Sequence, residues 1–162
     1  MGQFALNLLA LVVTALSLAP SFAHVLEALP RLTAWSPELW REATVFGGQF
    51  QLFAVVGAPL DIGAILVPAT LAYVLRNDRP AFRFAAAGAV LFAASLVVWM
   101  GWVAPANRVL ATWRPGPVPE DFFLIRNRWE TGHMVIAAIK LTGFVAVALS
   151  VLTSRSRGMP AR

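Results

Sequence analysis

Residues 82–104 read FRFAAAGAVLFAASLVVWMGWVA, an apolar run that carries a single charge at Arg83. About 20 consecutive apolar residues cross the hydrocarbon core of a bilayer as a helix, so this stretch is long enough to span a membrane. Three further runs of the same kind lie at about residues 4–29, 44–75 and 131–153. Because the runs are long and continuous, they predict helices and not the alternating strands of an outer-membrane barrel.

The composition of the whole chain indicates the same class. Of 162 residues, 59% are hydrophobic and 13% are charged, whereas soluble domains carry roughly 45–50% apolar and about 25% charged residues. Four spans and their connections occupy the whole length, so we expect one domain, residues 1–162. The predicted fold is all-α, an integral membrane four-helix bundle with up-down-up-down topology.

The connections indicate which helices are neighbours. Residues 76–80 form a tight turn, which makes the second and third helices antiparallel neighbours. Residues 30–43 and a long extramembrane loop, 105–130, lie at the other end of the bundle, and residues 154–162 form a basic tail. Tryptophans in and next to these connections are interpreted mainly as interfacial anchors; they are Trp35, Trp40, Trp113 and Trp129.

The basic residues favour a multi-pass protein of the cell membrane with both termini in the cytoplasm. Six arginines fall on each side of the bundle, so their number alone gives a tie. The arginines on the side of the termini lie in short segments with almost no acidic residues. This difference favours the orientation with both termini in the cytoplasm. The expected partners are the lipid bilayer and a hydrophobic small molecule. A net charge of +5 spread over loops and tail does not indicate nucleic acid, and an oligomer is compatible with the sequence.

Residues 1–23 also resemble a signal peptide, because the small residues Ser21 and Ala23 precede His24. Cleavage there would leave His24 as an N-terminal copper ligand. The segment has no basic residue before its apolar run, and that run is long. We therefore expect it to remain as the first helix.

The two histidines of the chain each lie three residues from a glutamate, in mirrored order: His24 with Glu27, and Glu130 with His133. Residues three apart share one face of a helix. The first pair lies near the end of the first span and the second near the start of the last. Antiparallel helices therefore bring all four side chains into one layer at one mouth of the bundle. Ionisable groups within a membrane are costly, which makes these four candidates for function.

Other polar and aromatic residues are expected near this layer. Gln49 lies on the second span, Trp99 and Trp102 lie on the third, and Asn107 follows just beyond. The residues expected to bind substrate are Trp99, Trp102, Trp129, Gln49 and Arg126. Deeper in the bundle, Asp61 and Lys140 are predicted to form a structural ion pair, because an isolated charge there is strongly disfavoured. A role of this pair in a proton path is the alternative.

The Glu-x-x-His spacing occurs in carboxylate-bridged metal bundles, but the second and third spans lack the carboxylates of a dinuclear centre. Three alternatives stay open. One is a mononuclear iron, copper or zinc site on His24, Glu27, Glu130 and His133. Another is a b-type haem between the two histidines, with Arg126 or Arg128 binding its propionates. The third needs no metal and uses one histidine as a general base. The chain has no cysteine, which excludes disulfides and thiolate ligands.

Residues 102–108, WVAPANR, and 126–133, RNRWETGH, resemble the signatures of a known family. They are similar to the aromatic, Pro-x-Asn and Arg-Trp-x-x-x-His motifs of small four-helix membrane proteins grouped as anthrone-oxygenase-like. Residues 24–30, HVLEALP, are similar to the end of the first helix in one bacterial branch. The resemblance implies oxidation of a polyketide anthrone to the quinone by O2, without an established cofactor. The shared residues are Asn107, Arg128, Trp129 and His133, and the branch adds His24 and Glu27.

We therefore expect a membrane-embedded oxidoreductase, oxygenase-like, that acts on a hydrophobic aromatic or quinol-type substrate. His133 or His24 would take a proton from the substrate, and the resulting anion would react with O2. Arg128 would stabilise the negative charge, and Asn107 would orient the substrate. The alternatives are a haem- or metal-binding membrane protein that uses His24 and His133, and a non-catalytic accessory protein.

Overall fold

The computed structural model describes residues 2–48 and 51–156, and every regular element in these two ranges is helical. The four long helices are α1 (Gln3–Thr33), α3 (Gln51–Val74), α4 (Arg79–Val98) and α6 (Phe122–Ser156). The shorter elements are the helices α2 (Pro37–Arg41) and α5 (Ala104–Leu110) and the π-helical turns η1 (Glu42–Phe46) and η2 (Trp99–Val103). The predicted all-α class is confirmed.

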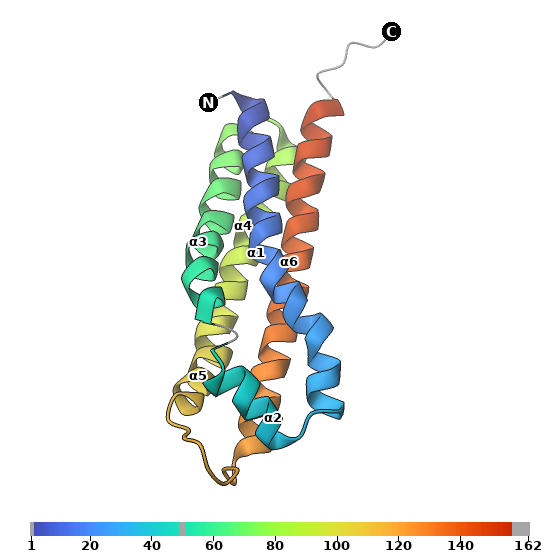
Figure 1. The fold of residues 1–162 in the computed structure, drawn as a ribbon. Coiled ribbons are helices and arrows are strands. Elements are labelled where there is room, and N and C mark those ends of the chain that lie inside the picture. The colour runs from blue at the N-terminus through green and yellow to red at the C-terminus, as the bar shows by residue number, and fades with distance from the viewer. Residues whose placement is uncertain (1, 49–50, 157–162) are drawn as a thin grey trace.

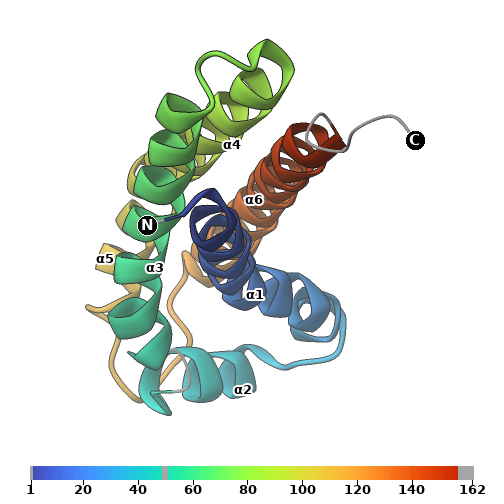
Figure 2. The ribbon, with the colours of Figure 1, turned by 90° about the horizontal axis from the view of Figure 1, so that it is seen from above.

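Within the described ranges, four stretches are long and apolar enough to cross a membrane: Gln3–Thr33, Val55–Val74, Arg79–Leu110 and Phe122–Ser154. The long helices run alternately in opposite directions, so α1 begins at the end of the bundle where α6 finishes (Figure 1). α1 packs against α3 and α6, and α4 packs against the same two helices (Figure 2). The chain is therefore a four-helix bundle, compatible with a multi-pass membrane protein.

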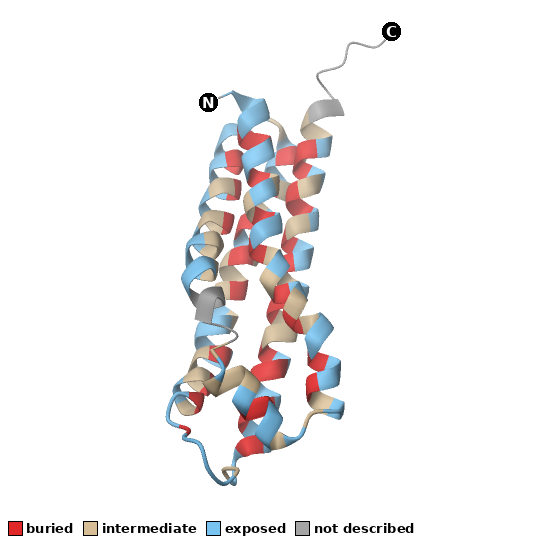
Figure 3. Cartoon of the chain, in the orientation of Figure 1, coloured by how far each residue is buried: buried red, intermediate tan, exposed pale blue. Residues whose placement is uncertain are grey.

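Small side chains close the half of the bundle that lies near the termini. The buried residues of this half are Leu6, Ala10, Leu71, Ala72, Leu75, Ala81, Ala85, Val147 and Val151. A Cβ atom added to Gly88 of α4 would lie 2.5 Å from Val147 Cγ2 of α6. Small residues let helix backbones approach closely in a membrane, where no hydrophobic force drives helices together. The outward faces of these helices are exposed (Figure 3) and carry large apolar side chains, as lipid contact requires.

Larger, aromatic side chains fill the opposite half. α1 contains Pro20 and bends near its middle (Figure 1), where the proline removes a backbone hydrogen bond. The aromatic cluster of this half includes Trp40, Trp113 and Trp129, whose exposed fractions are 0%, 7% and 4%. The prediction that these tryptophans are interfacial anchors is therefore wrong. They are core residues of the bundle.

Several helix ends differ from their predicted positions. α6 begins at Phe122 rather than near residue 131, and the third helix continues through η2 and α5 to Leu110. The predicted loop of residues 105–130 therefore shrinks to 111–121. Charged residues near the start of α6 lower its hydropathy, but their charges are satisfied within the protein, which a hydropathy pattern does not detect. Of the predicted tail, residues 157–162 lie outside the described ranges.

Candidate functional site

The site lies along the contact between α1 and α6. Ser17, His24 and Arg31 are each seven residues apart on α1, about two helical turns, so they share one face. α6 is antiparallel to α1 and supplies a partner for each of them in reverse order. We call the resulting contacts the lysine layer, the histidine layer and the arginine layer; they join Ser17 to Lys140, His24 to His133, and Arg31 to Glu130.

In the histidine layer the two imidazole rings are stacked. Their centroids are 4.2 Å apart and their planes are inclined by 21°. The indole of Trp129 meets both rings edge-on, at centroid distances of 5.2 Å from His24 and 4.4 Å from His133. His24 is buried and His133 is half-buried. The predicted convergence of the two histidines from opposite ends of the chain is confirmed.

Asn107 of α5 is tied to this layer through Trp129. The indole nitrogen of Trp129 donates a hydrogen bond of 2.8 Å to Asn107 Oδ1. An indole N–H can only donate, so it fixes which end of the amide faces it. The amide nitrogen of Asn107 is thereby left as the donor that a bound molecule can use.

The histidine layer opens into a cavity of about 630 Å³. α1, η1, α3, α4, η2, α5 and α6 all contribute to its wall, which is mostly apolar. Trp99 lies in the π-helical turn η2, and such turns often occur at functional sites. The cavity is within the usual size range of small-molecule sites. The predicted site residues that line it are His24, His133, Trp99, Trp129, Asn107, Asp61 and Lys140.

The lysine layer forms another part of the same wall. Lys140 Nζ lies 2.6 Å from Asp61 Oδ1 and donates a second bond of 3.2 Å to the backbone oxygen of Ser17. The hydroxyl of Ser17 donates to Asp61 Oδ1 at 2.6 Å. Lys140 is 4% exposed, and Asp61 is the group of opposite charge that it contacts. The predicted ion pair between Asp61 and Lys140 is confirmed.

The arginine layer uses both glutamates of the mirrored pairs. Arg31 donates to both carboxylate oxygens of Glu130, at 2.7 and 2.9 Å, and to Glu27 at 2.6 Å. Trp40 adds a hydrogen bond of 2.9 Å from its indole nitrogen to Glu130. Arg31 and Glu130 are each 1% exposed. Both carboxylates are therefore hydrogen-bonded to the guanidinium group of Arg31. These contacts close the mouth of the bundle.

This arrangement does not fit the predicted metal site on His24, Glu27, Glu130 and His133. A metal bound by imidazole and carboxylate needs their lone pairs directed at one point, but the glutamates face Arg31 and the imidazoles lie face to face. No group of three or more histidine, cysteine, aspartate or glutamate residues within 2–48 and 51–156 could hold a metal ion. A b-type haem does not fit either. A haem would have to lie between the two imidazoles, and the stacked rings, with centroids 4.2 Å apart, leave no space for it.

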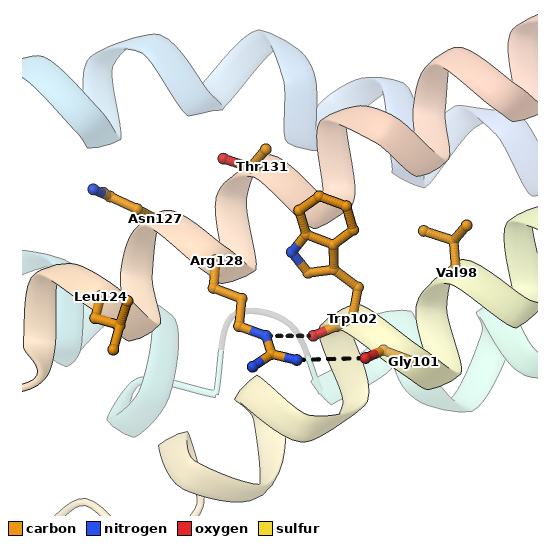
Figure 4. Close-up of a pocket in the computed structure, with 7 residues that line it drawn as sticks. All are labelled: Val98, Gly101, Trp102, Leu124, Asn127, Arg128 and Thr131. Carbon is orange, nitrogen blue, oxygen red and sulfur yellow. Dashed lines mark hydrogen bonds between the residues drawn. The ribbon is translucent and has the colours of Figure 1, made fainter.

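Arg128 and Trp102 lie at a different place from the one predicted. They line a separate open groove of about 740 Å³ (Figure 4), and neither contributes to the cavity wall. Arg128 Nε donates to the backbone oxygen of Trp102 at 3.2 Å, and Nη2 donates to that of Gly101 at 3.4 Å. Pro105, four residues after Gly101, has no N–H to donate to that carbonyl. Arg128 therefore caps carbonyl groups of the π-helical turn.

The predicted substrate contact Arg126 does not join the cavity either. Arg126 bonds to Asn127 Oδ1 at 3.0 and 3.2 Å and lies over the rings of Phe122 and Phe123. Its guanidinium is thus held on its own helix. Gln49 lies outside the described residues.

Arg31 and Ser17 are residues of this site that the sequence analysis missed. Arg31 appears there only as one of the six arginines on the side of the bundle away from the termini. The signal that could have identified Arg31 is its spacing, four residues after Glu27 and seven after His24, which places all three on one helical face.

Comparison of the chain with protein-family models, curated proteins and solved structures finds no match.

Proposed function

We propose that the protein is a membrane-embedded oxidoreductase, oxygenase-like, that binds a hydrophobic aromatic or quinol-type substrate in the cavity beside the histidine layer. The observation that carries the proposal is a pair of stacked imidazoles, His24 and His133, in the wall of a mostly apolar cavity of about 630 Å³ inside a bundle of apolar helices. Such a cavity selects an apolar ligand, and few polar groups within it would fix the orientation of that ligand. The indoles of Trp99 and Trp129 provide aromatic surface.

His133 is the general base of this proposal. Both histidines line the cavity, but His133 is half-buried whereas His24 is only 5% exposed. A neutral imidazole nitrogen accepts the proton of an aromatic hydroxyl or of an acidic CH2 group. Asn107 donates its amide N–H to the oxygen on which negative charge develops, because Trp129 occupies its other end.

The substrate anion is then oxidised by O2, which enters with the substrate from the bilayer. A hydroquinone gives up two electrons and two protons and forms the quinone, while O2 becomes H2O2. An anthrone loses both hydrogens of its CH2 group and gains one oxygen atom there, and the second oxygen leaves as water. Arg128 takes no part in the charge stabilisation, because it caps carbonyls outside the cavity.

The test is oxygen consumption by the purified protein in lipid nanodiscs, measured above the protein-free rate with a hydroxyanthrone and with a dihydroxynaphthalene. Removal of a general base costs about 10²–10⁴-fold in rate, so His133→Ala should lose at least 100-fold. Arg128→Ala is the matched control and should retain turnover. A His133→Ala protein that folds and turns over like the wild type would contradict the proposal and favour the non-catalytic alternative.

The proposal also includes an orientation in the cell membrane with both termini in the cytoplasm. The distribution of acidic residues among the arginines supports it. A fluorescent protein that folds only in the cytoplasm, fused to the C-terminus, should then be bright. A dark fusion at normal expression would reverse the orientation.

A further inference from the structure

The cavity has a second polar region, the lysine layer, for which the proposed chemistry has no use. Asp61 and Lys140 line the cavity together with His133 and Asn107. An ammonium group carries three N–H donors. Two of those on Lys140 bind Asp61 and the backbone oxygen of Ser17. The third has no acceptor among the described residues, and it is available to a molecule in the cavity.

Asp61 supplies the matching acceptor. Its Oδ1 atom accepts hydrogen bonds from both Ser17 and Lys140. Its Oδ2 atom accepts none from the residues that the structure describes, although a carboxylate oxygen has two acceptor sites. The lysine layer thus offers a ligand one donor and one acceptor.

The histidine layer offers the same combination. A ring nitrogen of neutral His133 is an acceptor. The amide nitrogen of Asn107 is a donor, since Trp129 occupies the amide oxygen. The cavity therefore has a donor and an acceptor in each of two layers, with apolar and aromatic wall between them.

The spacing of the layers limits the ligand. Seven residues separate Ser17 from His24 on α1, and seven separate His133 from Lys140 on α6, which is a rise of about 10 Å along either helix. A rigid ligand that contacts both layers must therefore carry its two polar groups at opposite ends of its ring. Among the dihydroxy isomers of one aromatic ring, the para isomer holds its two oxygens farthest apart, so it suits two separate layers best.

We infer that the lysine layer is a second substrate-contact site and that the substrate is a para-dihydroxy aromatic compound, with one hydroxyl bound in each layer. A hydroxyl group both donates and accepts, so it satisfies the two groups that each layer offers. A compound with a single hydroxyl leaves the second layer unsatisfied. The inference rests on the proposed function for the assignment of the cavity as the substrate site.

The experiment measures binding without oxidation, by anaerobic calorimetric titration of the protein in nanodiscs. The two probes are 1,4-dihydroxynaphthalene and 1-naphthol, which differ by one hydroxyl. A hydrogen bond to a charged group contributes enough to change affinity by about tenfold or more, so the dihydroxy probe should bind at least tenfold more tightly. Equal affinities in the wild-type protein would overturn the inference, whatever happens to any variant.

The variant Asp61→Leu/Lys140→Met removes both charges together and keeps the volume of the pair. Replacement of a buried ion pair by apolar residues of similar size is often neutral or stabilising, so this protein should fold. It should bind the two probes equally, because only the dihydroxy probe loses a contact. The matched variant Asp61→Asn/Lys140→Gln keeps a donor and an acceptor and should retain most of the preference. A preference that survives in the apolar variant would overturn the inference.

These outcomes separate the inference from the proposed function. If His133→Ala abolishes turnover but the probes bind equally to the wild type, the lysine layer is structural and the proposed function stands. If the wild type binds neither probe, the cavity is not a site for such molecules and both fail.

Discussion

Arg31 and Glu130 form an ion pair in which each residue is only 1% exposed. Their charges are both out of water, joined by two hydrogen bonds of 2.7 and 2.9 Å. Taking two ions out of water costs several kcal/mol each, and the cost is recovered only when both ions are fully hydrogen-bonded. Glu27, Trp40 and the backbone oxygen of His24 provide the additional bonds. The arginine layer is therefore intolerant of single changes.

We predict that Glu130→Ala destabilises the folded protein by about 3–5 kcal/mol, because it leaves the Arg31 guanidinium buried without its main partner. Thermal unfolding in detergent, followed by circular dichroism, measures the effect. Glu27→Ala is the control: its carboxylate also binds Arg31, but the side chain is 48% exposed, so the loss should be about 1 kcal/mol or less. Similar losses in both variants would mean that the two carboxylates share the Arg31 charge equally.

At this scale the sequence was informative where residue types are rare. Two histidines in a chain of apolar helices could only meet if the helices were antiparallel, and their rings are in contact. Arginines are common at membrane surfaces, so residue type alone does not distinguish Arg31 from the other arginines, whereas its spacing from Glu27 does. The predicted contact of Arg128 with the substrate is wrong for a related reason. The sequence around Arg128 indicates how deep it lies in the membrane, but the direction of its side chain depends on the backbone carbonyls near Pro105.

Among the helices, α4 and α6 are joined by their glycines. A Cβ atom on Gly88 would lie 2.5 Å from Val147 Cγ2, and one on Gly143 would lie 3.1 Å from the ring of Phe92. Valine is stiff because of its branched Cβ, so it cannot rotate away easily. The close approach of these two helices thus depends on the absence of side chains.

Gly88→Ala is accordingly expected to destabilise the bundle by about 1–3 kcal/mol, the usual cost of an added methyl group in a packed interior. The free energy of unfolding in a denaturing detergent titration provides the measurement. Gly101→Ala serves as a control for helix propensity, since a Cβ atom there meets nothing within 4 Å. Wild-type stability of Gly88→Ala would show that α4 and α6 can separate without cost.

Helix number and direction follow from the apolar runs, whereas helix ends do not. The start of α6 at Phe122 was missed because Arg126, Arg128 and Glu130 resemble a loop in hydropathy. Arg126 bonds to the next residue, Asn127, whereas Arg128 and Glu130 have partners on other elements, Trp102 and Arg31. The partners become visible only when the chain is folded, because those of Arg128 and Glu130 are far away in sequence.

Over the whole molecule, the two halves of the bundle differ in side-chain size, and the cavity follows from this difference. Alanine, glycine and valine let the helices close near the termini. Tryptophan and phenylalanine fill the other end, where α1 bends and residues of α2 and η1 pack into the aromatic cluster. The ion pairs then fix the walls: the arginine layer at the mouth and the lysine layer deeper inside. Ligand binding in such a cavity should weaken when an added side chain fills it. Binding should not change when the separate groove beside Arg128 is altered.

Gly57→Phe tests this account, because it adds a large side chain to the cavity wall at a position where a Cβ atom meets nothing within 4 Å. We expect the protein to fold, since the ring enters existing space, and to bind an aromatic ligand at least about tenfold more weakly, a loss of 1.4 kcal/mol or more. Gly101→Phe places the same ring at the separate groove beside Arg128 and should leave binding unchanged. Calorimetric titration of both variants with one probe decides between the two sites. If Gly101→Phe weakens binding and Gly57→Phe does not, the ligand occupies the outer groove, and the stacked histidines serve only to join α1 to α6.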